Sequence, residues 1–236
     1  MNNKQIKEFK VIAHIRTDFP EKFGIPRQSG MVDELVGKIV FEPAYHNPDA
    51  FSGLEEFSHI WLLWSFSANP VREEFCATVK PPRLGGNQKK GVFATRSPFR
   101  PNDIGLSCVR LEKVEFTKKE GPVLWVRGAD LMDQTPIYDI KPYLAYTDSH
   151  PEATEGFAGL YKNERLQVDF PEEFLRIYPT KHQKAVMELL SQDPRPAYKE
   201  DGEKRYGVSY AGYDVKFYVK DEVLHVCGIE KLQKKE

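Results

Sequence analysis

The segment Gly91–Ser107 (GVFATRSPFRPNDIGLS) carries residue types that suit ligand binding. It places Arg96, Arg100 and Asn102 among two prolines and Gly105, between two short apolar runs. Proline restricts φ and glycine reaches backbone angles closed to other residues, so the composition predicts a rigid loop. A guanidinium group matches the oxygens of a carboxylate or phosphate, which indicates an anionic ligand group. The alternative is a surface turn whose arginines form ordinary ion pairs, and this segment alone does not separate the two.

A second polar segment, Gly128–Tyr143 (GADLMDQTPIYDIKPY), contains Asp130, Asp133 and Asp139. It follows Pro122–Arg127, whose alternation is typical of a strand. Loops at strand ends are a common place for ligand contacts, and aspartates there could accept hydrogen bonds from a ribose or an ammonium group. The alternative is that each aspartate only closes a turn or caps a helix. The neighbouring arginine-rich loop favours a polar pocket.

Taken together, several separated segments resemble the TsaA-like family. They are Ala94–Ser107 (ATRSPFRPNDIGLS), Pro81–Gly86 (PPRLGG), Asp130–Tyr143 (DLMDQTPIYDIKPY), Lys22–Gly30 (KFGIPRQSG) and Gln192–Tyr198 (QDPRPAY). Bacterial members of that family are similar to the tRNA methyltransferase that methylates N6 of threonylcarbamoyladenosine at position 37. The resemblance implies S-adenosylmethionine as cofactor, a β-barrel catalytic domain rather than a Rossmann sheet, a homodimer and a tRNA substrate.

The resemblance also implies which residues contact the cofactor. They are Pro26, Arg27, Gln28, Ser67, Ala68, Arg96, Leu106, Asp130, Leu131, Met132 and Asp133. In chemical terms Arg96 would bind the methionine carboxylate. The Asp130–Asp133 segment would bind the ribose or ammonium, and Leu106 would form a wall beside the adenine.

Two of these positions depart from the family pattern. Similar proteins carry a histidine and a glutamine where this chain has Ser67 and Ala68. We therefore expect any contact from these two residues to be made by the backbone.

Methyl transfer from a sulfonium is an in-line displacement, so much of the catalysis is positioning. The N6 atom of threonylcarbamoyladenosine belongs to a urea and is a weak nucleophile until it loses its proton. Asp133, Asp139 and Tyr143 are candidates for a general base. The alternative for the last two is that the DIKPY run closes a turn through an Asp139–Lys141 contact, and the residues favour no single candidate.

Basic residues near the expected pocket are candidates for phosphate contacts, and aromatic residues could stack an extruded base. The candidates for RNA binding are Arg83, Lys89, Arg100 and Arg195; those for stacking are Phe99, Tyr45 and Tyr143. The alternatives are a solvated basic loop around Lys89 and a purely structural contact between domains at Arg195.

Composition limits these interpretations. The 236 residues carry a formal net charge of −1, so any RNA surface must be a local basic patch, with salt-sensitive binding. The three cysteines form no CxxC pair and the six histidines show no ligand spacing, so we expect no metal site. The N-terminal residues lack the apolar core of a signal peptide and no apolar run approaches membrane-spanning length, so we expect a soluble, cytoplasmic protein.

The elements that must position these residues are mainly strands. Strands are predicted at Phe9–Ile15, Gly37–Phe41, Ser58–Phe66, Val92–Ala94, Leu106–Phe116 and Val123–Arg127. No helical pattern lies between them and no G-x-G-x-x-G follows a strand. A closed or nearly closed β-barrel with long loops therefore fits better than a doubly wound sheet.

The C-terminal part predicts a small α+β domain. Pro171–Tyr178 and Lys181–Leu190 are expected to be short helices, with Val186, Leu189 and Leu190 on one face and a capping box formed by Thr180 and Gln183. A three-stranded antiparallel sheet should follow. We expect a barrel domain over residues 1–150 and the α+β domain over residues 164–236.

Three functions from different classes follow. The first is an S-adenosylmethionine-dependent methyltransferase that acts on N6-threonylcarbamoyladenosine in tRNA. The second keeps the cofactor but methylates another acceptor. The third is a non-catalytic sensor or adaptor protein that binds S-adenosylmethionine.

Overall fold

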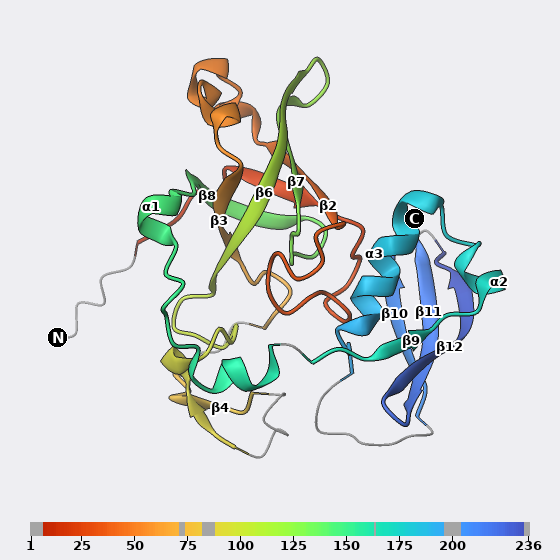
Figure 1. Cartoon of the computed structure of the whole chain (residues 1–236). Coiled ribbons are helices and arrows are strands. Elements are labelled where there is room, and N and C mark those ends of the chain that lie inside the picture. Colours follow the sequence, from red (N-terminus) through yellow and green to blue (C-terminus); the bar gives the residue numbers. More distant parts are fainter. Residues whose placement is uncertain (1–6, 71–73, 82–87, 163, 196–203, 234–236) are drawn as a thin grey trace.

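The computed structural model of the chain describes residues 7–70, 74–81, 88–162, 164–195 and 204–233 (Figure 1). The first part is a closed antiparallel barrel with the strand order β1-β2-β7-β6-β3-β8. Its strands are β1 (Ala13–Arg16), β2 (Val36–Phe41), β3 (His59–Ser65), β6 (Ile104–Thr117), β7 (Gly121–Arg127) and β8 (Thr135–Pro142). The prediction of a mainly β fold with an N-terminal barrel is confirmed.

Apolar side chains that alternate along the strands fill the barrel, because successive residues of a strand point to opposite faces. Ile15, Ile39, Leu62, Leu124 and Ile137 are fully buried. These residues come from five different strands, so closing the barrel is what brings the core together.

Short elements decorate the barrel. They are β4 (Thr78–Val79), β5 (Lys90–Gly91), α1 (Ala145–Asp148) and 3-10 turns at Pro43–Tyr45, Pro48–Phe51, Leu54–Glu56, Val92–Ala94 and Gly156–Tyr161. The prediction of a strand at Val92–Ala94 is therefore wrong. Val92 still donates its N–H to the carbonyl of Ala77 at 2.9 Å, but the chain then closes a 3-10 turn in which Thr95 N–H donates to Val92 O at 3.1 Å.

The second part is a small α+β domain, as predicted. A four-stranded sheet has the order β10-β11-β12-β9 and consists of β9 (Gln167–Asp169), β10 (Tyr206–Tyr210), β11 (Tyr213–Lys220) and β12 (Val223–Lys231). The helices are α2 (Glu172–Leu175) and α3 (Thr180–Ser191). Val186, Leu189 and Leu190 of α3 are buried in the core of this domain, which confirms the predicted apolar face.

Two details of this domain differ from expectation. The sheet gains β9, which pairs in parallel with β12 and is too short to show a period in the sequence. The predicted capping box is absent, since Pro179 precedes the helix and the side-chain amide of Gln183 instead donates to the carbonyls of Leu175 and Tyr178.

The loop between β1 and β2, residues 17–35, joins the two parts and is called the bridging segment below. Figure 1 shows it in red and orange between the barrel and α3. Its residues Phe19, Val32 and Leu35 are buried in the core of the C-terminal domain rather than in the barrel. Among the described residues, no helix is long and apolar enough to cross a membrane.

Candidate functional site

A cavity of about 470 Å³ opens at one end of the barrel. The end of β3 and the residues after it form one wall, and the start of β6 forms the next. The β7–β8 loop, the loop before β6 and the bridging segment complete the lining. Segments far apart in the sequence therefore converge at the same end of the barrel.

The floor of the cavity depends on Gly105. This residue pairs with Trp64 across β3 and β6, and a Cβ atom on Gly105 would lie 2.3 Å from the indole ring. The missing side chain lets the indole lie flat against β6, where its Nε1 donates to the hydroxyl of Ser107 at 3.0 Å. That hydroxyl in turn donates to Oδ1 of Asp130 at 2.6 Å. Three residues from two strands and a loop are thus joined in one hydrogen-bonded chain.

Asp130 is a partly buried carboxylate at the end of this chain. Burial raises the pKa of Asp130, while hydrogen bonds from Ser107 and the backbone and the charge of Arg96 act in the opposite direction. Among the described residues that line the cavity, Asp130 is the one carboxylate. The net result is an acidic group whose ionised form is less well solvated than in water, and which a cationic ligand would stabilise.

The two arginines of the loop before β6 have different partners. The Arg96 guanidinium donates to the side-chain oxygen of Gln28 on the bridging segment. The Arg100 guanidinium donates to the carbonyls of Val92 at 3.3 Å and Thr95 at 2.6 Å, and so folds its own loop. Arg96 is therefore the guanidinium that can exchange a neutral amide partner for an anionic ligand, whereas Arg100 braces the loop.

Most of the residues predicted to contact a cofactor line the cavity. They are Pro26, Arg27, Gln28, Ser67, Ala68, Arg96, Leu106, Asp130, Leu131 and Met132. At Ala68 the backbone carbonyl accepts a hydrogen bond from Lys22 Nζ at 2.8 Å. A role for these residues in cofactor contact stays a prediction.

Asp133 is not among the lining residues. Its Oδ1 accepts a hydrogen bond from the backbone N–H of Thr17 at 3.0 Å, and its own N–H donates to the carbonyl of Phe19 at 2.9 Å. Both partners belong to the bridging segment. In this structure Asp133 fastens that segment to the barrel.

The other two general-base candidates also lie away from the cavity lining. Asp139 is in β8, where its carboxylate contacts Lys141 at 2.9 Å. The expected contact is present, but it lies within a strand and closes no turn. Tyr143 packs against His59 and Trp61, at the end of β3 remote from the cavity. The structure does not bring either side chain to Asp130, so their catalytic role remains only a prediction.

The RNA-binding candidates are scattered. Arg83 lies outside the described residues. Lys89 is exposed directly before β5, and Arg100 lines the cavity. Arg195 forms an ion pair with Asp193 at 2.8 Å, in the C-terminal domain.

Sequence reasoning did not assign a role in the site to Lys22, Trp64, Gly105 or Ser107. Lys22 donates to Ala68 O and Asn69 Oδ1, which ties the bridging segment to the loop after β3 across the cavity. Lys22, Gly105 and Ser107 fall inside segments that carry the family resemblance, and that was the available signal. Trp64 lies in an apolar run that predicts only a buried strand.

Known proteins resemble this chain over nearly its full length. The model of the tRNA-methyltransferase O N-terminal domain matches residues 14–149, and that of the TrmO C-terminal domain matches residues 163–232. An Escherichia coli protein named tRNA (adenine(37)-N6)-methyltransferase is 39% identical over 231 residues, covering 94% of this chain and 97% of the relative.

A Pseudomonas aeruginosa protein, RcsF, whose name classes it with S-adenosylmethionine-dependent methyltransferases, is 39% identical over 227 residues, 92% of this chain and 95% of the relative. A crystal structure of TrmO from P. aeruginosa superimposes with a TM-score of 0.79 at 33% identity and covers 98% of this chain and all of that one. Both domains, in the same order and with the same barrel, show that the chain belongs to the tRNA-methyltransferase O family.

Proposed function

We propose that this chain is an S-adenosylmethionine-dependent methyltransferase that methylates N6 of N6-threonylcarbamoyladenosine at position 37 of tRNA. The observation that carries the proposal is the cavity at the end of the barrel, in which separate segments gather the expected cofactor residues. The name of the E. coli relative supports adenine 37 of tRNA and its N6 atom, and the name of the P. aeruginosa relative supports the methyl donor.

The cavity lining fits S-adenosylmethionine in size and chemistry. About 470 Å³ is within the range of small-molecule pockets, about 300–1,000 Å³. Arg96 offers a bidentate donor for the methionine carboxylate, and Asp130 offers an acceptor for the ammonium or ribose. Leu106 and Trp64 supply apolar walls. When bound, the cofactor supplies a methyl group activated by a positively charged sulfur.

The residues of the chain contribute mainly positioning. Arg96 and Asp130 lie on different loops, so together they can orient a zwitterionic donor from two sides. The partly desolvated carboxylate of Asp130 also places negative charge beside a cationic ligand. Holding donor and acceptor in line can replace a large part of the barrier of a bimolecular reaction. We propose the barrel domain (residues 1–150) as the cofactor-binding part and residues 164–236 as a second domain with an RNA contact at Arg195.

A homodimer is also part of the proposal. Phe75 and Phe93 are exposed by 62% and 71% and stack on each other with ring centroids 6.1 Å apart. Phe93 precedes the loop that carries Arg96, and Leu106 at the cavity is exposed by 54%. Exposed apolar side chains of this kind favour coverage by a second copy of the chain. A sedimentation or light-scattering mass of one chain at micromolar concentration would contradict the dimer.

The test compares two tRNA pools. The protein is incubated with radiolabelled S-adenosylmethionine and total tRNA from cells that can, or cannot, make threonylcarbamoyladenosine. Label that enters only the competent pool supports the proposed reaction. Equal label in both pools would indicate another acceptor, and label in neither pool despite calorimetric binding of the cofactor would favour the sensor or adaptor function.

Binding of the RNA can be tested separately through salt. If Lys89 and Arg195 contact phosphates, raising the salt concentration should weaken tRNA binding steeply, because counterions are released on binding. Cofactor binding should change much less over the same range. Lys89→Ala should reduce the salt slope for tRNA and leave cofactor affinity as in the wild type.

A further inference from the structure

The bridging segment has two faces with different partners. Toward the barrel end, Lys22, Ile25 and Gln28 line the cavity. Toward the C-terminal domain, Phe19 is fully buried and its ring lies 5.2 Å from that of Tyr210 in β10. Ile25 belongs to both surfaces, since it also packs against the C-terminal core. One wall of the cavity is therefore the outer layer of another domain's core.

Close packing fixes this wall to β10. Gly24 has φ +91°, and a Cβ atom there would lie 2.7 Å from a methyl of Val208. The backbone of the segment thus rests directly on the Val208 side chain. Two hydrogen bonds beside this contact hold the register: Ala211 N–H donates to Asp18 O at 3.0 Å, and Ser209 Oγ donates to Glu21 Oε1 at 2.8 Å.

The same segment then holds the opposite wall. Lys22 Nζ donates to the carbonyl of Ala68 at 2.8 Å and to Asn69 Oδ1 at 2.9 Å, in the loop after β3. Gln28 accepts from Arg96 of the loop before β6. A displacement of the segment would therefore move donors and acceptors on two other loops of the cavity.

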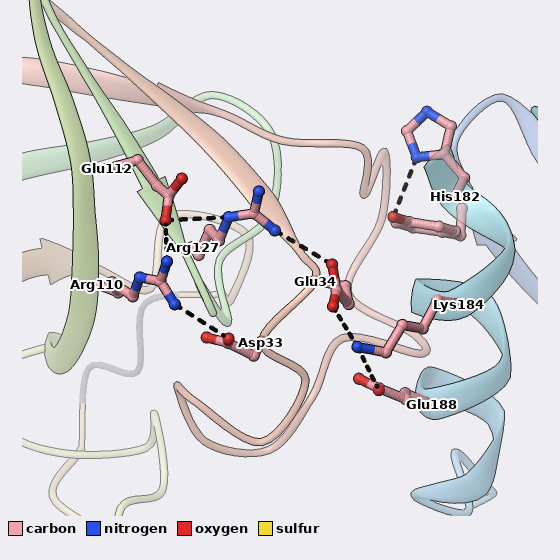
Figure 2. Close-up of polar contacts among 9 residues, drawn as sticks. Asp33, Glu34, Arg110, Glu112, Arg127, His182, Lys184 and Glu188 are labelled. Carbon is pink, nitrogen blue, oxygen red and sulfur yellow. Dashed lines mark hydrogen bonds and ion pairs between the residues drawn. The ribbon is translucent and has the colours of Figure 1, made fainter. Parts of the chain in front are cut away.

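Polar contacts connect the two domains around this segment as well. Figure 2 shows that Glu34 accepts from Arg127 of β7 and from Lys184 of α3, so that one carboxylate joins the barrel to the C-terminal helix. Arg127 also contacts Glu112 at 3.2 Å. The segment is held at both ends as well as at its centre.

We propose that the C-terminal domain positions the cofactor-binding wall through the bridging segment. Phe19, Gly24 and Val208 then act as positioning residues for the cofactor, although none of them lines the cavity. The inference rests on the proposed function, because it takes the cavity to be the S-adenosylmethionine site. It assigns the C-terminal domain a part in cofactor binding, in addition to any contact with RNA.

The test uses two variants of the full chain that remove the same atoms. Val208→Ala removes the methyl groups beneath Gly24. Val219→Ala removes two methyl groups from the same core. Val219 lies in β11, in the part that pairs with β12 and not with β10, and so it serves as the control. Thermal unfolding of both establishes that they fold. Calorimetric titration with S-adenosylhomocysteine, the cofactor without its transferable methyl group, then measures the affinity of the cavity for this ligand. We expect Val208→Ala to bind S-adenosylhomocysteine at least about 5-fold more weakly than the wild type, which is the lower end of the usual coupling between two sites. Val219→Ala should bind it as the wild type does.

Two further readouts separate positioning from a general loss of stability. Val208→Ala should raise the KM for S-adenosylmethionine while leaving kcat at saturating cofactor unchanged. Lys22→Met should weaken affinity too, and its effect should add incompletely to that of Val208→Ala, because both act through one segment. Full additivity of the two changes would overturn the inference.

Hydrogen exchange of the wild-type protein needs no variant. Because coupling is reciprocal, S-adenosylhomocysteine should slow amide exchange in β10 and at Ala211, outside the cavity, as well as in residues 17–35. Unchanged exchange in β10, or equal affinities of Val208→Ala and Val219→Ala, would overturn the inference and leave the proposed function standing. Absence of any wild-type binding of S-adenosylhomocysteine would overturn both.

Discussion

At the scale of single residues, the cavity contains a guanidinium, that of Arg96, and a carboxylate, that of Asp130, which have different hydrogen-bond partners. The Arg96 guanidinium donates a hydrogen bond to the neutral side-chain amide of Gln28. Asp130 is held by a buried serine that itself accepts from Trp64. Arg96 is thus able to change partners on ligand binding, whereas Asp130 is fixed in place beforehand. A zwitterionic ligand would meet one adaptable and one preorganised group.

Arg96→Ala should weaken cofactor binding by about 1.5–3 kcal/mol, the usual worth of a hydrogen bond to a charged group. The physical reason is loss of the donor for the methionine carboxylate. Calorimetric titration of S-adenosylhomocysteine measures the change. Lys89→Ala, an exposed cation outside the cavity lining, serves as the control and should bind normally; an unaltered affinity of Arg96→Ala would remove Arg96 from the site.

Asp130 makes cofactor affinity depend on pH. Burial raises its pKa above the ordinary 3.8, and a cationic ligand favours the ionised form. Affinity of the wild type should therefore increase as the pH rises from 3.8 through the raised pKa, with proton release on binding. Asp130→Asn should bind weakly with a flat pH profile over that range. Asp139→Asn, outside the cavity, should keep the wild-type profile, and identical profiles for all three proteins would refute the assignment.

The same shift has the opposite effect on folding. A carboxyl group whose pKa is raised in the folded state contributes stability below its unfolded value, and that contribution is lost as the pH rises through the folded pKa. Asp130→Asn should therefore be at least as stable as the wild type at neutral pH, although it binds the cofactor less well. Denaturant unfolding at neutral and acid pH measures this difference.

At the scale of elements, the paired strands β3 and β6 decide the shape of the cavity floor. Trp64 occupies the space that a side chain at position 105 would need. The glycine is required by this close approach and not by its backbone angle. The hydrogen bonds from Trp64 to Ser107 and from Ser107 to Asp130 therefore depend on glycine, which has no side chain, at position 105 of the neighbouring strand.

Gly105→Ala should destabilise the fold by about 1–3 kcal/mol, as expected for overpacking in a core, and should displace the indole of Trp64. Gly91→Ala is the matched control, because a Cβ atom at Gly91 meets nothing within 4 Å. The control should lie within about 0.5 kcal/mol of the wild type. Urea unfolding followed by fluorescence measures both, and equal stabilities would contradict the packing argument.

At the scale of the whole molecule, the two domains share a segment and an ion-pair network. The hydrogen bond from Lys184 lowers the pKa of Glu34, and the charge of Arg127, on the barrel side, lowers it further (Figure 2). A carboxylate with a lowered folded pKa contributes stability above its unfolded value, 4.5, and loses it as the pH falls. The link between domains should thus weaken in acid and at high salt.

Glu34→Gln should lower the Tm at neutral pH and low salt, with the difference shrinking below pH 4.5 and at high salt. Glu172→Gln is the matched control: Glu172 pairs with Arg176 four residues along the chain, without joining the domains. The control should change the Tm little, because exposed pairs of this kind are weak. A Glu34→Gln difference that persists in acid would argue against the ionic link.

The sequence by itself determined the mainly β class, most barrel strands and the apolar face of α3. These features are local, since they follow from alternation and helical spacing. The residues expected to contact the cofactor were implied by the resemblance to a known family, and most of them line the cavity. The strand β8 was missed for a local reason as well. Its two prolines and outward charges suggest a loop, whereas barrel closure supplies partners on both sides in β1 and β3.

Only the tertiary structure decided which candidates meet. In the structure Asp130 lines the cavity, whereas Asp133 accepts a hydrogen bond from the bridging segment, although the two lie three residues apart in one motif. It also assigned Phe19, Val32 and Leu35 to the core of a domain that begins more than a hundred residues later. Such contacts depend on packing between distant parts of the chain, and neither spacing nor composition encodes which apolar surface another will cover.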